Sequence, residues 1–417
     1  MSTTSAAILY LGLDVHKESV VSAVQPDDAV PPRQVDTLPY DLGRLKRYLD
    51  RLARDGAELR CVYEASGAGY VLQRAIQSWG YHCDICAPSL TPRRPGHQRK
   101  HNRYDAKELA RYYRNGELVV IAIPTEAEER TRDLVRCRTT MQRQLHRARQ
   151  FVLKFCRRRG LRYAPAAGKG CHWTKAHRAW LEARRADPAL APEDQTVLGE
   201  YLALMHYTEQ RRDALDQQLE AMALSPALAA AVATLGAFRG LEFHAALVLG
   251  SEVRDWRRFA TATQVMAYLG LVPREDSSET ERRGSITKAG NTHCRHVLVQ
   301  AAWAYRHPPR VGRALRARQA GVDGRVIVLS WKAQHRLHAL YKRLAARRGV
   351  HIAVVAVARE LVGFLWAALR EDREPTRHGA RSSTQLEGVK ASAAPRSGPQ
   401  LRKTSTSKTA VGQRRKA

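Results

Sequence analysis

Two carboxylates, Asp14 and Glu64, stand at the ends of short apolar segments of the sequence. Asp14 closes the segment ILYLGLD and Glu64 closes RCVYE, and both segments are typical of buried β-strands. A carboxylate at the end of a core strand is costly to bury unless it meets a cation or a polar partner. With Asp105, and Glu108 near it, at the start of an expected helix, these acids predict a Mg²⁺ site. The alternative for each acid taken singly is a helix cap or a surface salt bridge.

A serine pair forms the second set of residues that could do chemistry. Ser277 and Ser278 lie between two glycine-containing turns in LGLVPREDSSETERRGSITKAGN, with Arg282 and Arg283 shortly after them. A hydroxyl among arginines can attack a phosphodiester, because guanidinium groups offset the charge that gathers around the phosphorus. From composition alone, the favoured alternative is a loop whose serines only donate hydrogen bonds to a phosphate.

The remaining cysteines and histidines favour simpler roles. Cys83 and Cys86 form a C-x-x-C pair without a second pair at zinc spacing, so we expect both thiols in the core. Four histidines are expected at polar surfaces or against phosphates and not on a metal: His97, His101, His172 and His177.

The elements that must position the acids form an expected α/β domain. Residues 8–14 and 20–24 predict a β-hairpin, and residues 60–86 predict a strand, a small-residue turn, a helix and a strand. The second pattern is a βαβ unit, which implies a parallel pair of strands. A loop rich in proline and basic residues covers 89–104, and a helix is expected from about Asp105.

A long helix is predicted from Thr125 to Arg159. The capping-box spacing of Thr125 and Glu128 marks its start, and eleven basic residues between Arg130 and Arg159 face one acid, Asp133. This imbalance favours contact with a nucleic-acid backbone over a merely solvated face.

A second long helix, over about 195–223, predicts an antiparallel helical pair or a coiled-coil stalk, while 160–194 has no assignment. Residues 226–312 form a further domain, and 313–371 are helical and end in an apolar run at 354–369.

Composition limits the class of protein. The 417 residues carry 70 Lys and Arg against 40 Asp and Glu, a net charge of +30, with 44% hydrophobic residues. The hydrophobic content excludes a wholly disordered chain, and the charge requires a polyanion, for which nucleic acid is favoured over a membrane. From Thr376 onward, ten basic residues against Glu387 predict a disordered basic tail. Seven irregularly spaced cysteines indicate a reducing cytoplasm, not a disulfide framework.

Several motifs together resemble one family. They are YLGLDVHKE, VYEASG, KHNRYDAKELARYYRNGEL, WTKAHRAWL, MAYLGLVPREDSSETERRGSITKAGN and VQAAWAYRHPPR, in this order over roughly residues 8–370. They are similar to the bridge-RNA-guided IS110 group of insertion-sequence transposases. The resemblance implies an α/β RNase H-like, Holliday-junction-resolvase-like domain (1–124), a helical coiled-coil region (125–225), a mainly α serine transposase domain (226–371) and a basic tail (372–417).

The resemblance also implies roles for single residues. The family's four acids fall on Asp14, Glu64, position 102 and Asp105, which would bind Mg²⁺, and its nucleophilic serine falls on Ser278. Ser278 would form a transient phosphoserine link to DNA, and strands would exchange through a junction intermediate. The residues expected to contact nucleic acid are Arg99, Lys100, Arg103, Arg282, Arg283, Lys288 and Asn291.

The partners implied by the resemblance are DNA, at the element ends and the target, and a structured guide RNA that selects both by base pairing. Two dimers would assemble into a tetramer in the bacterial cytoplasm, without membrane attachment. Each active site would be shared between the acidic domain of one subunit and the serine domain of another. The long helical pair is the expected dimerisation element.

Two residues depart from the family pattern. Asn102 replaces the third acid, which removes one negative charge and should weaken Mg²⁺ binding. Glu279 replaces the glycine after the nucleophile and adds a negative charge beside the incoming phosphate. Two alternatives to the recombinase therefore stay open: a metal-dependent junction nuclease that uses water as its nucleophile, and a degenerate copy that binds nucleic acid without cutting it.

Overall fold

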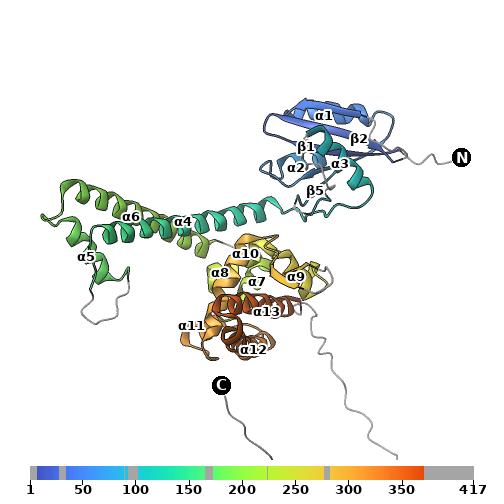
Figure 1. Ribbon diagram of the computed structural model, residues 1–417. Coiled ribbons are helices and arrows are strands. Elements are labelled where there is room, and N and C mark those ends of the chain that lie inside the picture. The colour runs from blue at the N-terminus through green and yellow to red at the C-terminus, as the bar shows by residue number, and fades with distance from the viewer. Residues whose placement is uncertain are drawn as a thin grey trace, which may run out of the picture. The chain divides into compact units, whose positions relative to one another are not determined.

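The computed structural model describes residues 7–27, 34–88, 90–92, 102–164, 172–222, 224–276 and 282–370 (Figure 1). Several residues singled out in the sequence lie outside these ranges: His97, Arg99, Lys100, His101, Ser277, Ser278, Glu279 and the basic tail. The side chains of Asn102, Arg282 and Arg283 also lie outside the description.

A five-stranded mixed sheet forms the N-terminal part of the chain, in the order β3-β2-β1-β4-β5. The strands are β1 (Ile8–Val15), β2 (Ser19–Pro26), β3 (Gln34–Pro39), β4 (Glu58–Glu64) and β5 (His82–Cys86). Neighbours among β1, β2 and β3 are antiparallel, whereas β4 is parallel to both β1 and β5. The predicted hairpin and the predicted βαβ unit are therefore confirmed.

Helices cover both faces of this sheet. Alternating side chains of β1 separate the two faces, because Leu11 and Leu13 pack with α1 (Leu42–Leu52) and α2 (Val71–Ser78). The other face is covered by α3 (Asn102–Arg114), whose Ala106 and Ala110 pack with β2. A Cβ atom added to Gly12 of β1 would lie 2.2 Å from the Ala106 carbonyl oxygen, so the glycine permits α3 to approach the strand closely. The α/β expectation is confirmed.

The predicted placement of the C-x-x-C pair is also confirmed. Cys83 and Cys86 are both fully buried on β5, and burial raises the pKa of the Cys86 thiol to about 12. Both residues therefore act as small apolar groups of the core.

The long helix α4 (Glu126–Arg158) and the helix α6 (Pro192–Ala221) run side by side (Figure 1). Thr125 Oγ1 accepts a hydrogen bond from Glu128 N (3.2 Å) and Glu128 Oε2 accepts one from Thr125 N (2.8 Å), so the expected capping box is present. A short helix, α5 (Lys175–Arg185), packs against the pair through Leu181. The predicted helical pair is confirmed. Residues 160–194, which had no assignment from the sequence, contain the helix α5.

His177 on α5 differs from its expected place at a polar surface. The residue is 1% exposed and its ring is stacked on Trp180, with Trp173 and Tyr163 edge-on to it. Burial, with the nearby cations, lowers the pKa of His177 to about 4. The expectation was wrong because the neighbouring aromatic residues form a small core around the imidazole.

The C-terminal part of the chain is mainly helical, as expected. Its elements are α7 (Pro226–Gly236), α8 (Phe243–Val253), η1 (Trp256–Arg258), α9 (Ala262–Tyr268), β6 (Pro273–Asp276), β7 (Arg282–Ile286), α10 (Thr292–Ala302), η2 (Trp303–Arg306), α11 (Arg313–Arg318), α12 (Gly324–Arg348) and α13 (Val350–Arg370). One large hydrophobic core joins the helices. The hairpin of β6 and β7 is an addition that the sequence pattern did not predict.

Helix α13 is long and apolar enough to cross a membrane by length and composition alone. Half of its most apolar stretch is buried, and Val357, Leu361 and Leu365 are fully buried in the core. The apolar character of α13 is thus explained by its place as a central core helix.

Candidate functional site

The ends of β1 and β4 bring Asp14 and Glu64 together at one edge of the sheet. Leu13 and Tyr63 are register partners in the parallel ladder, so Asp14 and Glu64 follow them at equivalent positions on neighbouring strands. Asp14 lies two residues after Gly12 and therefore projects to the α3 face, since side chains alternate along a strand. Both carboxylates are partly buried.

Helix α3, which carries Asp105, covers the same face of the sheet. Asp105 lies in the first turn of α3, directly before Ala106, whose carbonyl group is in close contact with Gly12. The glycine contact therefore fixes the start of α3 against the strand that carries Asp14. Asn102 is the first residue of this helix.

The acids have hydrogen-bonding partners within the domain. His16 Nε2 lies 3.0 Å from Asp14 Oδ2, and Thr91 Oγ1 donates to Glu64 Oε1 at 3.0 Å. Within the described ranges, no three His, Cys, Asp or Glu side chains gather closely enough to hold a metal ion. A pair of carboxylates nevertheless suits Mg²⁺, which usually takes one or two of them and completes its shell with waters and substrate phosphate.

The second half of the candidate site is the β6–β7 hairpin. Pro273 pairs with Ile286 and Asp276 pairs with Arg282 across antiparallel strands. Residues 277–281, which include Ser278, join the two paired ends and lie outside the described residues.

Two glycines hold the base of this hairpin. Gly270 and Gly290 both have positive φ values, +65° and +96°. A Cβ atom on Gly270 would lie 1.9 Å from the Ala289 carbonyl oxygen, and one on Gly290 would lie 2.0 Å from the Tyr268 carbonyl oxygen. The two turns thus pack backbone against backbone, which only glycine permits at both positions. The two glycines of this motif therefore fix the base of β6 and β7, the strands on either side of Ser278 in the sequence.

A buried ion pair joins the hairpin base to the long helix α4. The Glu252 side chain on α8 is 2% exposed, and Arg136 of α4 donates to its two oxygens at 2.7 and 2.9 Å. Asn291 Nδ2 also donates to Glu252 Oε2, at 2.7 Å. Burial alone would raise the pKa of Glu252, but the hydrogen bonds from Arg136 and Asn291 outweigh it and the pKa is lowered. The lone acid in the apolar segment LVLGSEV was the only signal in the sequence for this role.

Asn291 also caps helix α10. Its Oδ1 accepts hydrogen bonds from the backbone N–H groups of His293 (2.9 Å) and Cys294 (3.1 Å). The amide that was expected to contact nucleic acid is therefore engaged with α10 through its oxygen and with Glu252 through its nitrogen.

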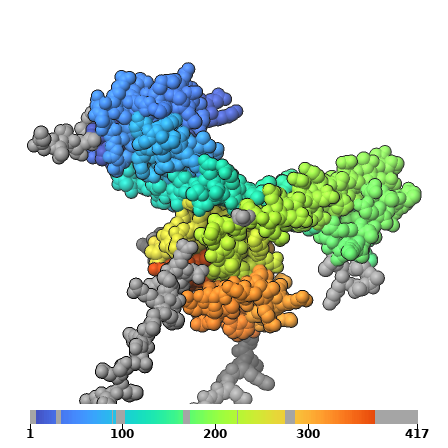
Figure 2. Space-filling model, turned by 180° about the vertical axis from the view of Figure 1, so that it is seen from behind, coloured from blue at the N-terminus to red at the C-terminus, as the bar shows by residue number. Residues whose placement is uncertain are grey.

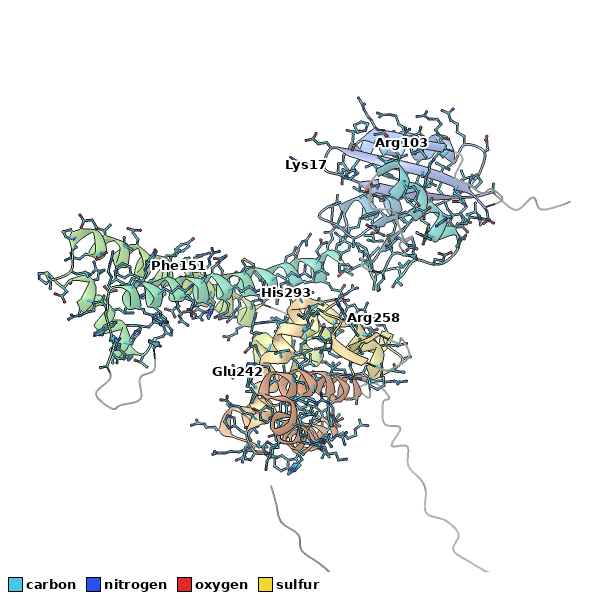
Figure 3. All side chains as sticks on the ribbon, in the orientation of Figure 1. Lys17, Arg103, Phe151, Glu242, Arg258 and His293 are labelled. Carbon is cyan, nitrogen blue, oxygen red and sulfur yellow. The ribbon has the colours of Figure 1, made fainter. Side chains whose placement is uncertain are left out.

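The other expected nucleic-acid contacts occupy separate elements. Arg103 is exposed on α3 and donates to the Val35 carbonyl oxygen at 3.1 Å. Lys288 is exposed, with φ +56°, in the turn that precedes α10. Arg282 and Arg283 lie on β7. Figure 3 shows Arg103 in the sheet domain and His293, beside Asn291 in sequence, in the helical domain.

Many cations of α4 are paired inside the molecule. Arg138 makes two hydrogen bonds to Asp216 of α6, at 2.6 and 2.8 Å, and Arg149 pairs with Glu209 of α6 at 2.8 Å. Arg136 pairs with Glu252, as described above. The face that was predicted to contact a nucleic-acid backbone is therefore used partly for packing with α6 and α8.

The chain is similar to known transposases. The model of the family described as Transposase IS116/IS110/IS902 matches residues 233–315, which contain the β6–β7 hairpin. The chain is 40% identical over 339 residues to y4qE of Sinorhizobium fredii, a transposase by its given name, with 80% of each chain covered. It is 26% identical over 343 residues to the transposase for insertion sequence element IS1533 of Leptospira borgpetersenii, covering 82% of this chain and 97% of the relative.

An α/β domain with paired acids at a strand edge, followed by a helical domain with a glycine-held hairpin, is here the architecture of a DNA transposase, an enzyme that moves DNA segments. The chain belongs to the IS116/IS110/IS902 family of insertion-sequence transposases.

Proposed function

We propose that this transposase cuts and rejoins DNA with a two-part active site, formed by the acids of the sheet edge and by Ser278 of the hairpin. The observation that carries the proposal is the register of β1 and β4, which sets Asp14 and Glu64 side by side. The packing of Gly270 against Gly290 supports a fixed base for the serine segment. The strand order, with three antiparallel strands followed by two parallel ones, supports an RNase H-like fold for the first part.

The proposed reaction is a transesterification. The Ser278 hydroxyl oxygen attacks the phosphorus and loses its proton, while one DNA oxygen leaves and takes up a proton. The new phosphoserine ester replaces the broken phosphodiester bond, so a DNA hydroxyl can later attack it and release the serine. Arg282 and Arg283, next along the chain, would offset the charge on the phosphoryl oxygens.

The acids would hold Mg²⁺ beside the same phosphate. Asp14 and Glu64 would supply two carboxylate oxygens. Asp105 and Asn102, in the first turn of α3, are the further donors that the family pattern offers, with the Asn102 amide oxygen in place of a fourth acid. The ion, when bound, would offset negative charge on the phosphate. The role of this chain's residues is to place the oxygen donors at the edge where β1, β4 and the start of α3 meet.

A guide RNA and a symmetric assembly complete the proposal. The net charge of +30 suits a protein that holds DNA and a structured RNA together. Dimers that pair into a tetramer would use α6, on which Val197, Leu204 and Tyr207 are exposed at spacings of seven and three residues. Such an apolar stripe on a long helix suits packing against a second copy. The enzyme would act in the bacterial cytoplasm.

The main alternative is a junction nuclease in which water attacks the phosphate and no protein–DNA bond forms. The two mechanisms are distinguished by mixing the full-length protein with the element RNA, DNA that carries the element ends, and Mg²⁺, and by then denaturing the protein. We expect a covalent adduct with the wild type and with Ser277→Ala, the matched control, but none with Ser278→Ala. Cleavage by the wild type without any adduct would favour the nuclease.

The departures at positions 102 and 279 test the degenerate-copy alternative. Asn102→Asp restores a charge to the metal site, and Glu279→Gly removes a charge beside the incoming phosphate. We expect each change to raise recombination in a plasmid assay and Asn102→Asp to lower the Mg²⁺ concentration for half-maximal activity. If recombination is unchanged in both variants, the departures are neutral.

A further inference from the structure

Helix α12 has an unusual exposed face. Its 25 residues, Gly324–Arg348, contain no acid, and seven of them are basic. The buried side has Val326, Ala333 and Leu337 in the core, with the polar Ser330 and Gln334 between them. All seven cations are exposed to solvent, and Figure 2 shows the orange surface of this part of the chain at one end of the helical domain.

Two of these seven cations form ion pairs with described residues. Arg325 pairs with Asp323, and Arg336 pairs with Glu360 of α13. The other five make no ion pair with any residue in the described part of the chain: Lys332, Lys342, Arg343, Arg347 and Arg348. A run of unpaired cations attracts a polyanion because binding releases counterions from it.

An aromatic ring lies within this charged face. Trp331 is 43% exposed, and Val328, one turn earlier, is 53% exposed. His335, one turn later, lies edge-on to Trp331, with 4.6 Å between the ring centroids. At 3.6 residues per turn, Trp331, His335 and Lys342 share one side of the helix and span about 16 Å. We define the α12 face as Val328, Trp331, Lys332, His335, Lys342 and Arg343.

We propose that the α12 face binds an unpaired strand of RNA, with one base stacked on Trp331 and phosphates beside Lys332, Lys342 and Arg343. Aromatic rings among cations are the usual platform for single strands, since each base presents a π-face. Bases in duplex DNA are already stacked and cannot lie on the ring. The choice of RNA over single-stranded DNA rests on the proposed function, in which a structured RNA supplies unpaired loops.

A membrane surface fits this face less well. Val328 and Trp331 are its only large apolar side chains, and the remaining apolar side of α12 is buried in the core. Interfacial helices bury a whole apolar face among the lipids. The α12 face therefore offers charge and one ring, which match nucleic acid.

The test uses full-length protein and fluorescent oligouridylate of about 12 nucleotides, with oligothymidylate, a DNA duplex and anionic phospholipid vesicles as separate probes. We expect Trp331→Ala to weaken oligouridylate binding about 5-fold or more, Trp331→Phe to retain most of it, and duplex binding to be unchanged. Val71→Ala, which shortens an exposed apolar side chain on α2, should match the wild type for every probe.

Three results would overturn the proposal: unchanged oligouridylate binding by Trp331→Ala, equal losses on duplex or vesicles, or a Trp331-dependent preference for oligothymidylate. A failure of the proposed RNA guidance would give a different result. If Trp331 is needed for oligouridylate binding while recombination proceeds without any element RNA, RNA guidance fails and the α12 face stands.

Discussion

The helices α4 and α12 are both strongly basic, but in the described part of the chain acids of other elements pair with three arginines of α4 and with one cation of α12, Arg336. On α4, arginines at 136, 138 and 149 are matched by acids of α8 and α6. On α12, most cations have no acid beside them in the part of the chain that the structure describes. The charge of a single helix therefore does not identify a nucleic-acid surface, because the acids that neutralise it can come from distant elements. Glu252 lies 116 residues from Arg136.

The sharpest test of this difference is stability. Arg136→Ala would leave Glu252 buried without its cation, and we expect it to lower the free energy of unfolding by about 2–4 kcal/mol. Lys342→Ala on α12 should change it by less than about 0.5 kcal/mol. Urea unfolding of the full-length protein measures both. Equal destabilisation by the two variants would remove the distinction between the helices.

A second test measures nucleic-acid binding by the two helices. The double variant Lys332→Ala, Lys342→Ala removes two proposed phosphate contacts, so the slope of log K against log salt for oligouridylate should become shallower by about 1.4. Arg138→Ala on α4, whose guanidinium is held by Asp216, should leave that slope unchanged. If Arg138→Ala makes the slope shallower and the double lysine variant does not, the RNA-binding surface lies on α4 and not on α12.

The aromatic core around His177, where α5 packs against α4 and α6, should respond to pH. Because the pKa of His177 is lowered to about 4 in the folded chain, the unfolded chain binds more protons between about pH 6.5 and pH 4. The stability of the α4–α5–α6 region is thus fully present above about pH 6.5 and falls as the pH drops towards 4. Hydrogen exchange at Leu181 and Leu198 measures this, and His177→Phe should reduce the pH dependence. A pH-independent wild type would contradict the burial of a neutral imidazole.

The smallest expected effect concerns exposed pairs. Arg130 and Glu126 form an ion pair near the start of α4 with exposed side chains, 77% and 61%. Arg130→Ala should therefore change the unfolding free energy by at most about 0.5 kcal/mol. A loss as large as that from Arg136→Ala would mean that position along α4, not burial of the partner, decides the effect.

The sequence predicted those features that depend on local pattern. The strands that carry Asp14 and Glu64 at their ends, within one residue, the capping box at Thr125 and the burial of Cys83 all followed from periodicity and spacing. The register that sets the two acids side by side agrees with the parallel βαβ unit, because the carboxyl ends of neighbouring parallel strands meet at one edge.

Features that depend on long-range contacts could not be predicted in this way. The partner of Glu252, the backbone contact of Gly270 with Ala289 and the aromatic surroundings of His177 are fixed by packing between distant elements. The glycines of the serine motif were visible in the sequence, but the atoms that exclude a side chain there were not. The three-acid grouping with Asp105 stays a prediction.

In the proposed active site, the acids at the strand ends of one subunit and Ser278 of another subunit act on one phosphodiester. The most direct measurement mixes two inactive variants, Glu64→Gln and Ser278→Ala, and assays recombination. A shared site predicts measurable recovery, because in a mixed assembly the intact acids of one subunit meet the intact serine of the other. If the two variants still assemble with each other but their mixture stays inactive, the shared site is contradicted.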